Sequence, residues 1–304
     1  MKRLIKANLI LLASLLLLSS CAGSETKQGE SDQNAAHPSD EIKVMTFNIR
    51  LDTPVDSLNV WANRLPKVDA FLDSISPDVL GAQEVLHNQL QDLLAALPGY
   101  EWYGVGRTDG KEEGEYQPLF WKKDRFEALD KGHFWLSATP NEPSFGWDAA
   151  CERTAVWALL RDKETGEEIL FLNTHLDHIG EVARINSITM IKDSLISIAG
   201  DRDFVAMGDF NADKETNVIK AMLDNGNSPR RILDTRSLAD EVLGPEWSWH
   251  DFGREPVEKR ELIDFIFLSA EDPEVRSHAV LAEEDAPDHL YLSDHAPVLV
   301  RMAL

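Results

Sequence analysis

The sequence predicts an α/β protein, and three observations support this fold class. From Ile42 onward, short apolar runs rich in strand-forming residues alternate with segments whose apolar residues recur at helical spacing. The connections between these segments are short, as in layered α/β folds. With 304 residues, 43% of them hydrophobic, the chain can bury the core of one large domain or two small ones. Because residues 42–304 contain no linker, internal repeat or low-complexity segment, we expect one domain over that range.

The first part of this range predicts two strand–helix pairs. Residues 42–47 alternate like a strand, and apolar residues at helical spacing over 61–75 predict a helix that ends before Pro77. Residues 79–84 predict a short strand that ends in a carboxylate. A second helix is predicted over 86–97, where leucines recur on one face.

The remainder of the range predicts further strands and two more helices. Apolar runs predict strands at 118–121, 154–160, 168–173, 204–207, 262–268 and 296–300. Helical spacing predicts an amphipathic helix over 182–198 and a short helix over 219–223.

One stretch, residues 204–213, combines a predicted strand with polar residues that could act in catalysis. Its apolar start predicts a buried strand, and Gly208 is expected to let the chain turn and approach a ligand closely. Asp209 and Asn211 are expected to project to the same side, because they are two residues apart at a strand end. A carboxylate oxygen suits a hard cation, and a carboxamide can donate to a phosphoryl or water oxygen. A turn that only closes the strand is the alternative for these residues taken alone.

Similar polar groups occur at the ends of five other predicted strands. Asn48 and Glu84 follow the first two strands, and they could also be a strand-to-loop cap and a helix N-terminal carboxylate. The other polar residues at strand ends are His175, Asp177, His178, Asp264, Asp294 and His295. Asp264 lies among Leu, Ile and Phe, and burying an unpaired carboxylate is unfavourable. We therefore expect an imidazole partner for Asp264, and both His295 and His175 are candidates.

Taken together and in chain order, these motifs resemble the endonuclease/exonuclease/phosphatase superfamily, whose fold is that of deoxyribonuclease I. The resemblance covers residues 42–304 and is greatest for compact exported bacterial members, which also share the motifs at 134–137 and 146–151. It implies a four-layer αββα sandwich, in which two mixed β-sheets pack face to face with helices outside. It also implies metal-dependent hydrolysis of a phosphoester by an attacking water.

The resemblance implies roles for individual residues. The metal ligands, for one or two ions of Mg²⁺ or Mn²⁺, would be Glu84, Asn48 and Asp294. The catalytic set would be His175, Asp209, Asn211, Asp264 and His295. Asp209 would orient or deprotonate the water, Asn211 would hold a phosphoryl oxygen, and the histidines would stabilise the transition state.

Further residues are candidates for contacting the substrate: Arg107, Tyr116, Arg153, Asp177, His178 and Trp147. Arg107 and Tyr116 belong to a segment where relatives place groups that face the substrate, although a solvated loop is equally consistent. Arg153 is either a second phosphate clamp or an ion pair with Glu152. Trp147, with Trp135 and Phe145, could form an aromatic platform or only pack.

The N-terminus predicts a bacterial lipoprotein signal peptide over residues 1–21. A basic start precedes an apolar core that is too short to span a membrane, and 18–21 is similar to a lipobox, with Cys21 as the lipidated residue. An ordinary signal peptide that contains a cysteine is the alternative. Residues 22–41 are polar and predict a disordered tether. We therefore expect an extracytoplasmic protein, lipid-anchored to a bacterial membrane on its periplasmic face or at the cell surface.

Charge and cysteine content restrict the partners. The formal net charge is -23, from 53 acidic and 30 basic residues, which disfavours nucleic acid because phosphate-backbone affinity depends on Lys and Arg. Cys151 then has no disulfide partner and is interpreted as a packing residue. We expect a monomer.

The sequence therefore predicts a hydrolase of a small phosphoester such as a sugar phosphate, an inositol phosphate or a lipid headgroup. Whether the ester is a monoester or a diester stays open. Two alternatives are kept: an exported nuclease that uses the same residues, and a non-catalytic surface binding protein on the same fold.

Overall fold

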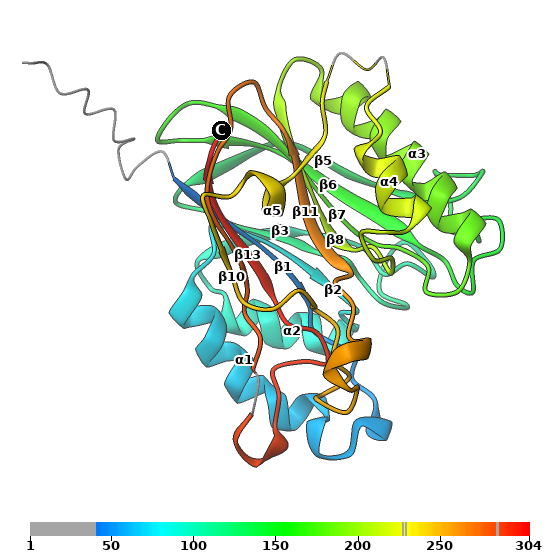
Figure 1. The fold of residues 1–304 in the computed structure, drawn as a ribbon, viewed down its shortest axis with the longest axis vertical. Helices are drawn as coiled ribbons and strands as arrows, with labels where there is room; N and C mark the ends of the chain where they lie inside the picture. Colours follow the sequence, from blue (N-terminus) through cyan, green and yellow to red (C-terminus); the bar gives the residue numbers. More distant parts are fainter. Residues whose placement is uncertain (1–40, 227, 229, 284–285) are drawn as a thin grey trace, which may run out of the picture. The chain divides into compact units, whose positions relative to one another are not determined.

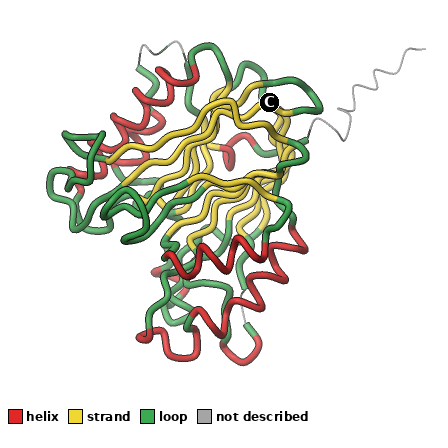
Figure 2. The backbone as a smooth tube through the Cα atoms, turned by 180° about the vertical axis from the view of Figure 1, so that it is seen from behind, coloured by secondary structure: helices red, strands yellow, loops and turns green. Residues whose placement is uncertain are grey.

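Two mixed β-sheets lie face to face at the centre of the fold, with helices on their outer faces (Figures 1 and 2). The computed structural model describes residues 41–226, 228, 230–283 and 286–304, and all of these belong to one compact unit. The predicted signal peptide, the lipidation of Cys21 and the tether up to residue 40 lie outside the described residues. In the part of the chain that is described, no helix combines the length and apolar character needed to cross a bilayer.

The first sheet has the strand order β10-β12-β13-β1-β2-β4-β3. Its strands are β1 (Ile42–Asn48), β2 (Val79–Gln83), β3 (Tyr100–Tyr103), β4 (Leu119–Lys122), β10 (Glu241–Leu243), β12 (Glu274–Val280) and β13 (Val298–Ala303). The second sheet has the order β5-β6-β7-β8-β11-β9. Its strands are β5 (Phe126–Trp135), β6 (Thr154–Asp162), β7 (Glu168–His175), β8 (Asp203–Asp209), β9 (Leu233–Asp234) and β11 (Asp264–Ser269).

Helices cover both sheets. The α-helices are α1 (Trp61–Ile75), α2 (His87–Ala96), α3 (Glu181–Ala199), α4 (Asn217–Leu223) and the short α5 (Thr235–Leu238). Three 3₁₀ turns, η1 (Pro54–Asn59), η2 (Val257–Lys259) and η3 (Pro287–His289), lie in the loops. Figure 1 shows α1 and α2 against the first sheet, and α3 and α4 against the second. This is the four-layer sandwich that the sequence predicts.

Strand periodicity sorts apolar side chains into two cores. In β1, Val44 belongs to the cluster between the sheets, whereas Met45 and Phe47 belong to the cluster under α1 and α2. Successive side chains of a strand point to opposite faces, so one central strand supplies both layers. All the predicted strands and helices of residues 42–304 form, whereas β3, β5, β9, β10, β12 and α5 were not predicted.

Strand register brings the polar strand ends together. His175 of β7 is the register partner of Asp209 of β8, and Asp209 is in turn the partner of Asp264 of β11. In the first sheet, Asn48 of β1 is the partner of Gln83 of β2, which precedes Glu84. Residues that are far apart in sequence therefore lie side by side at the ends of adjacent strands.

A buried polar network joins the two sheets directly beneath these ends. The Gln83 side-chain amide donates to Asn173 Oδ1 at 2.7 Å and to Thr46 Oγ1 at 2.9 Å. Asn173 Nδ2 donates to the Ala82 and Pro118 carbonyls. Because buried amides are favourable only when they are paired, this network fixes one alignment of the sheets and of the strand ends above it.

The expected role of Gly208 is wrong. The glycine lies inside β8 with a φ of 149°, and a Cβ placed there would be 2.0 Å from the Thr174 carbonyl oxygen. Glycine is therefore needed for the close approach of β7 and not for the approach of a ligand.

Candidate active site

The strand ends open into a cavity of about 530 Å³, here called the strand-end cavity. The predicted site residues in its wall are Glu84, Arg107, Arg153, His175, His178, Asp209, Asn211, Asp294 and His295. Asn48 and Asp264 lie behind this wall and contact residues that form it. The wall carries both carboxylates and three arginines, Arg50, Arg107 and Arg153.

Asn48 links the carboxylates of the two sheets. Its Nδ2 donates to Glu84 Oε1 at 3.1 Å and to Asp209 Oδ2 at 3.0 Å. Its Oδ1 accepts the Arg50 backbone N–H at 3.0 Å. In this arrangement the carboxamide nitrogen positions Glu84 and Asp209, and the oxygen keeps a second lone pair beside the Arg50 N–H.

Glu84 and Asp294 lie on either side of Arg50, whose guanidinium is 3.8 Å from each carboxylate. Burial would raise the pKa of Glu84, but the charge of His295, the Leu51 N–H and Arg50 together lower it. Burial and the proximity of Glu84 raise the pKa of Asp294. Arg50 also pairs with Asp56 at 3.0 Å, so it is shared among three carboxylates.

The structure decides which imidazole Asp264 holds. His295 Nδ1 is 2.8 Å from Asp264 Oδ2, and its Nε2 is 3.8 Å from Asp209 Oδ2. Burial alone would lower the pKa of His295, but Asp264 and then Asp209 raise it to about 10. Burial, together with Asp264, raises the pKa of Asp209 to about 7.

His175 has a different environment, although it lies on the other side of the same carboxylate. Its Nε2 is 3.5 Å from Asp209 Oδ2, while its buried Nδ1 has no hydrogen-bond partner among the described residues. Burial, reinforced by the positive charge of Arg153, holds the pKa of His175 well below its usual value. Two imidazoles with opposite pKa shifts therefore face Asp209.

Two further arginines, Arg107 and Arg153, line the cavity. Arg107 makes a bidentate pair with Glu115, at 2.8 and 2.5 Å. Arg153 pairs through Nε with Asp177 at 3.3 Å, so the predicted alternative of an ion pair with Glu152 is wrong. Its Nη2 is 2.9 Å from His178 Nδ1. Its Nη1 is buried and has no hydrogen-bond partner in the described part of the chain. An unpaired guanidinium N–H in a cavity wall suits an oxyanion.

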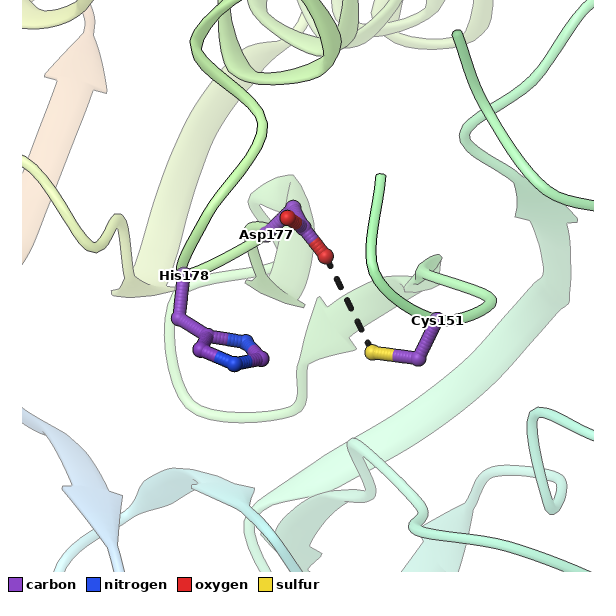
Figure 3. Close-up of side chains that lie close together, drawn as sticks. All are labelled: Cys151, Asp177 and His178. Atoms are coloured by element: carbon purple, nitrogen blue, oxygen red, sulfur yellow. Dashed lines mark hydrogen bonds between the residues drawn. The ribbon is translucent and has the colours of Figure 1, made fainter. Parts of the chain in front are cut away.

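Cys151, Asp177 and His178 lie close together (Figure 3). Arg153 contacts the last two of them. Cys151 Sγ is 3.8 Å from Asp177 Oδ2, and the thiol lies in the cavity wall, so its environment is more than core packing. Burial raises the pKa of this thiol, which disfavours a thiolate. Asp177 itself accepts the backbone N–H groups of Ile179 and Gly180, so it shapes the loop and supports Arg153.

Three expected substrate contacts lie outside the cavity wall. Tyr116 is buried and contacts His87 through its hydroxyl, Asp177 lies behind Arg153, and Trp147 is 45% exposed. The proposed aromatic platform does not line the cavity either, because Trp135 is buried and Phe145 is exposed. Conversely, Glu115 and Arg50 line the cavity and were not predicted, although each is within two residues of a predicted site residue.

Comparison with known proteins identifies the family. A model of the endonuclease/exonuclease/phosphatase family matches residues 45–295. The chain belongs to that family. A family protein from Bacteroides vulgatus is similar at 43% identity, with a TM-score of 0.82, over 87% of this chain and 99% of that one.

Two further structures are similar over a comparable span. A mannosyl-6-phosphatase from Bacteroides thetaiotaomicron is 32% identical, covers 86% of this chain and 100% of its own, and has a TM-score of 0.79. D. rerio TDP2 in complex with a single-stranded DNA product is 17% identical, covers 87% and 99%, and has a TM-score of 0.68, which shows the shared fold alone.

Endonuclease/exonuclease/phosphatase family members are phosphoester hydrolases that use divalent metal ions, and the carboxylates of the cavity wall fit such an ion. Glu84, Asp209 and Asp294 supply oxygen donors to the wall, and Asp264 Oδ1 is buried without a hydrogen-bond partner among the described residues. Asp209, Asp264 and His295 have potential ligand atoms within 4.8 Å of one another. The group formed by Cys151, Asp177 and His178 does not fit a cation, because the Arg153 guanidinium already contacts both Asp177 and His178.

Proposed function

We propose that this member of the family hydrolyses the phosphomonoester of a small sugar with Mg²⁺ or Mn²⁺, outside the cytoplasm. The observation that carries the proposal is the strand-end cavity of about 530 Å³, whose wall combines carboxylates, arginines and histidines. That volume is within the range of small-ligand sites and is too small for a long polymer to be enclosed. The similarity to a mannosyl-6-phosphatase supports a sugar phosphate over the other small esters that the sequence leaves open.

Glu84 and Asp294 would hold the metal ion, with Asp209 beside them. When bound, the ion supplies positive charge that stabilises the charge developing on the phosphoryl oxygens. Magnesium suits this donor set because it is bound through few carboxylates and retains water.

The chain's own residues orient the reactants. Asp209 is placed to orient and deprotonate the attacking water, since Asn48 fixes one of its oxygens at 3.0 Å. Asp264 holds the His295 ring through Nδ1, which directs Nε2 toward Asp209 and the cavity. His175 Nε2 lies 3.5 Å from Asp209 Oδ2. The side-chain amide of Asn211 donates to the Leu176 carbonyl, which fixes the position of Asn211. Arg153, in the cavity wall, would bind the phosphate or a substrate hydroxyl through its guanidinium, whose Nη1 has no hydrogen-bond partner among the described residues.

The direct test compares substrates on one full-length preparation, stripped of metal and then supplied with Mg²⁺ or Mn²⁺. Mannose 6-phosphate, glucose 6-phosphate, a chromogenic phosphodiester and plasmid DNA are incubated with wild type and with Asp209→Ala. We expect metal-dependent phosphate release from a sugar phosphate that the variant lacks. Turnover of the diester or nicking of DNA without sugar-phosphate hydrolysis would overturn the monoester proposal. Absence of calorimetric Mg²⁺ or Mn²⁺ binding would overturn the metal dependence.

We also propose that Cys21 anchors the chain to a bacterial membrane on its outer side. The lipobox-like sequence at 18–21 supports this location. Detergent phase partitioning of wild type against Cys21→Ser tests it, and equal partitioning of both into the aqueous phase would contradict it.

A further inference from the structure

A second cavity, of about 760 Å³, lies against the loop formed by residues 247–260, and we call it the loop cavity. The wall residues on which the inference rests are Leu58, Trp247, Phe252, Arg254, Val257 and Arg260. None of these residues lines the strand-end cavity.

One loop supplies walls to both cavities. Trp247 and Arg260 face the loop cavity, whereas Trp249 and Glu261, each two positions or fewer away, face the strand-end cavity. A second link is the ion pair of Arg50, in the strand-end cavity, with Asp56, in the loop cavity, at 3.0 Å. The two cavities are therefore neighbours.

Arg260 is the unusual group in the loop cavity. Its Nε donates to the Glu255 carbonyl at 2.8 Å, and its guanidinium lies 4.4 Å above the Trp247 ring centre. Within the described residues, no carboxylate lies within ion-pair distance of Arg260, whereas Arg254 nearby pairs with Asp251 at 2.6 Å. In a chain with 53 acidic residues, a half-buried arginine without a carboxylate partner is available to an external oxyanion.

The rest of the cavity suits a ring with one apolar face. Leu58 and Val257 are 49% and 62% exposed at its wall, while Trp247, Phe252 and Tyr291 are buried beneath it. Polar groups at the same wall, such as Ser57 and Asn59, can hydrogen-bond hydroxyls at the edge of a ring. A sugar combines an apolar ring face with hydroxyl edges, so it matches this arrangement.

We propose that the loop cavity binds a sugar ring that carries an oxyanion, such as a carboxylate, sulfate or phosphate, recognised by Arg260. The side chains of the loop cavity support this binding site independently of the proposed function. The acidic sugar can come from two sources: a distal unit of a larger substrate whose phosphoester is in the strand-end cavity, or a separate acidic monosaccharide.

Calorimetric titration of the full-length chain tests this binding. The metal-stripped Asp209→Asn variant serves as the background, so that hydrolysis does not interfere. The probes are glucuronate, glucose 6-sulfate, uncharged glucose and AMP. We expect saturable binding of glucuronate and glucose 6-sulfate, and at least about tenfold weaker binding of glucose, because the charge-assisted hydrogen bond is lost.

Substitution of Arg260 connects the binding to the loop cavity. Adding Arg260→Gln to this background should weaken glucuronate binding by about tenfold or more, and the matched change Lys259→Gln, at an exposed neighbour, should not. Thermal unfolding of both variants shows whether the fold is kept, and Arg260→Lys separates charge from guanidinium geometry. Absence of saturable binding, equal binding of glucose, tighter binding of AMP, or binding unchanged by Arg260→Gln would each overturn the proposal.

Kinetics on the chain with Asp209 intact distinguish the two sources. If Arg260→Gln raises KM for a disaccharide phosphate that contains a uronate, but not for a chromogenic phosphomonoester, the loop cavity binds a distal substrate unit. If Arg260→Gln abolishes glucuronate binding and leaves both KM values unchanged, the cavity binds a separate acidic monosaccharide. Either result supports the proposed binding site.

Discussion

The strand-end cavity and the loop cavity differ in how fully their positively charged side chains are paired with carboxylates. In the strand-end cavity, Arg50, Arg107, Arg153 and His295 each lie within 4 Å of at least one carboxylate. In the loop cavity, Arg260 has none among the described residues, and only an aromatic face and a carbonyl contact it. A paired cation holds a carboxylate in place, whereas an unpaired one is free to bind an anion that enters from outside. The first cavity is therefore arranged for chemistry, and the second for recognition.

The largest expected effect comes from replacing Asp209, because Asn48, His175 and His295 all contact its carboxylate. Asp209→Asn keeps the shape of the side chain, but it loses the negative charge and one of the two acceptor oxygens that contact Asn48 and Asn211, and it cannot accept a proton from water. We expect kcat to fall by about 10³-fold, within the usual range for the loss of a general base. Steady-state phosphate release measures this, with the exposed Asp201→Asn as control. Glucuronate should bind this variant as tightly as it binds wild type, and weaker binding to the variant than to wild type would show that the two cavities are not independent.

Asp264 should matter less, because it acts through His295. We expect Asp264→Asn to reduce kcat by about 10²-fold, because the imidazole loses its charged partner at 2.8 Å. A double-mutant cycle separates positioning from general destabilisation: in a His295→Ala background, Asp264→Asn should change kcat little. Additive losses in the double variant would contradict this coupling.

Arg153 tests whether the arginines in the cavity wall bind the substrate. Arg153→Lys keeps the charge but removes the planar guanidinium and its unpaired Nη1. We expect KM for the sugar phosphate to rise by about tenfold, with a smaller change in kcat. The matched control is Arg161→Lys, a partly exposed arginine near the far end of β6 and outside the cavity wall, which should leave both constants unchanged. A fall in kcat at constant KM would instead give Arg153 a role in the chemical step.

The sequence predicts the strand-end cavity well for a physical reason. Apolar runs that end in polar residues predict polar groups at strand ends, and the family resemblance predicts that His175, Asp209 and Asp264 share one site. The register of the strands places them side by side. The partner of Asp264 could not be chosen in this way, because His295 and His175 both lie near the same edge. Only the three-dimensional arrangement shows that His295 reaches Asp264 while His175 reaches Asp209.

The sequence does not predict what lies in loops and at sheet edges. β5 is an edge strand with exposed polar residues such as Glu127 and Lys131 and a bulge at Ala128–Asp130, so its alternation is weak. Tyr116 was expected to face the substrate, but its backbone bridges to Val85 and draws the ring inward. The loop cavity combines residues near 57, 254 and 290, and no local pattern predicts that these segments meet.

His278, which lies outside both cavities, is also buried without a carboxylate contact in the described part of the chain, and the expected effect of replacing it is the smallest. The Thr235 hydroxyl donates to the Ile266 carbonyl, so it accepts from His278 Nδ1, at 3.0 Å. Burial, and secondarily Arg236, lowers the pKa of His278 to about 4, the opposite of the shift at the equally buried His295.

This shift predicts a dependence of stability on pH. Because the folded pKa lies below the unfolded value of about 6.5, the unfolded chain binds the proton first, and His278 lowers stability as pH falls from about 6.5 toward 4. Between pH 7.5 and 5.5, wild type should lose about 1 kcal/mol more unfolding free energy than His278→Asn, which keeps a donor near Nδ1 but does not titrate. Urea unfolding at the two pH values measures the difference, and the exposed His289→Asn should behave as wild type. Parallel pH dependence of wild type and His278→Asn would mean that folding does not shift the pKa of His278, so that a carboxylate partner would not be what distinguishes His295.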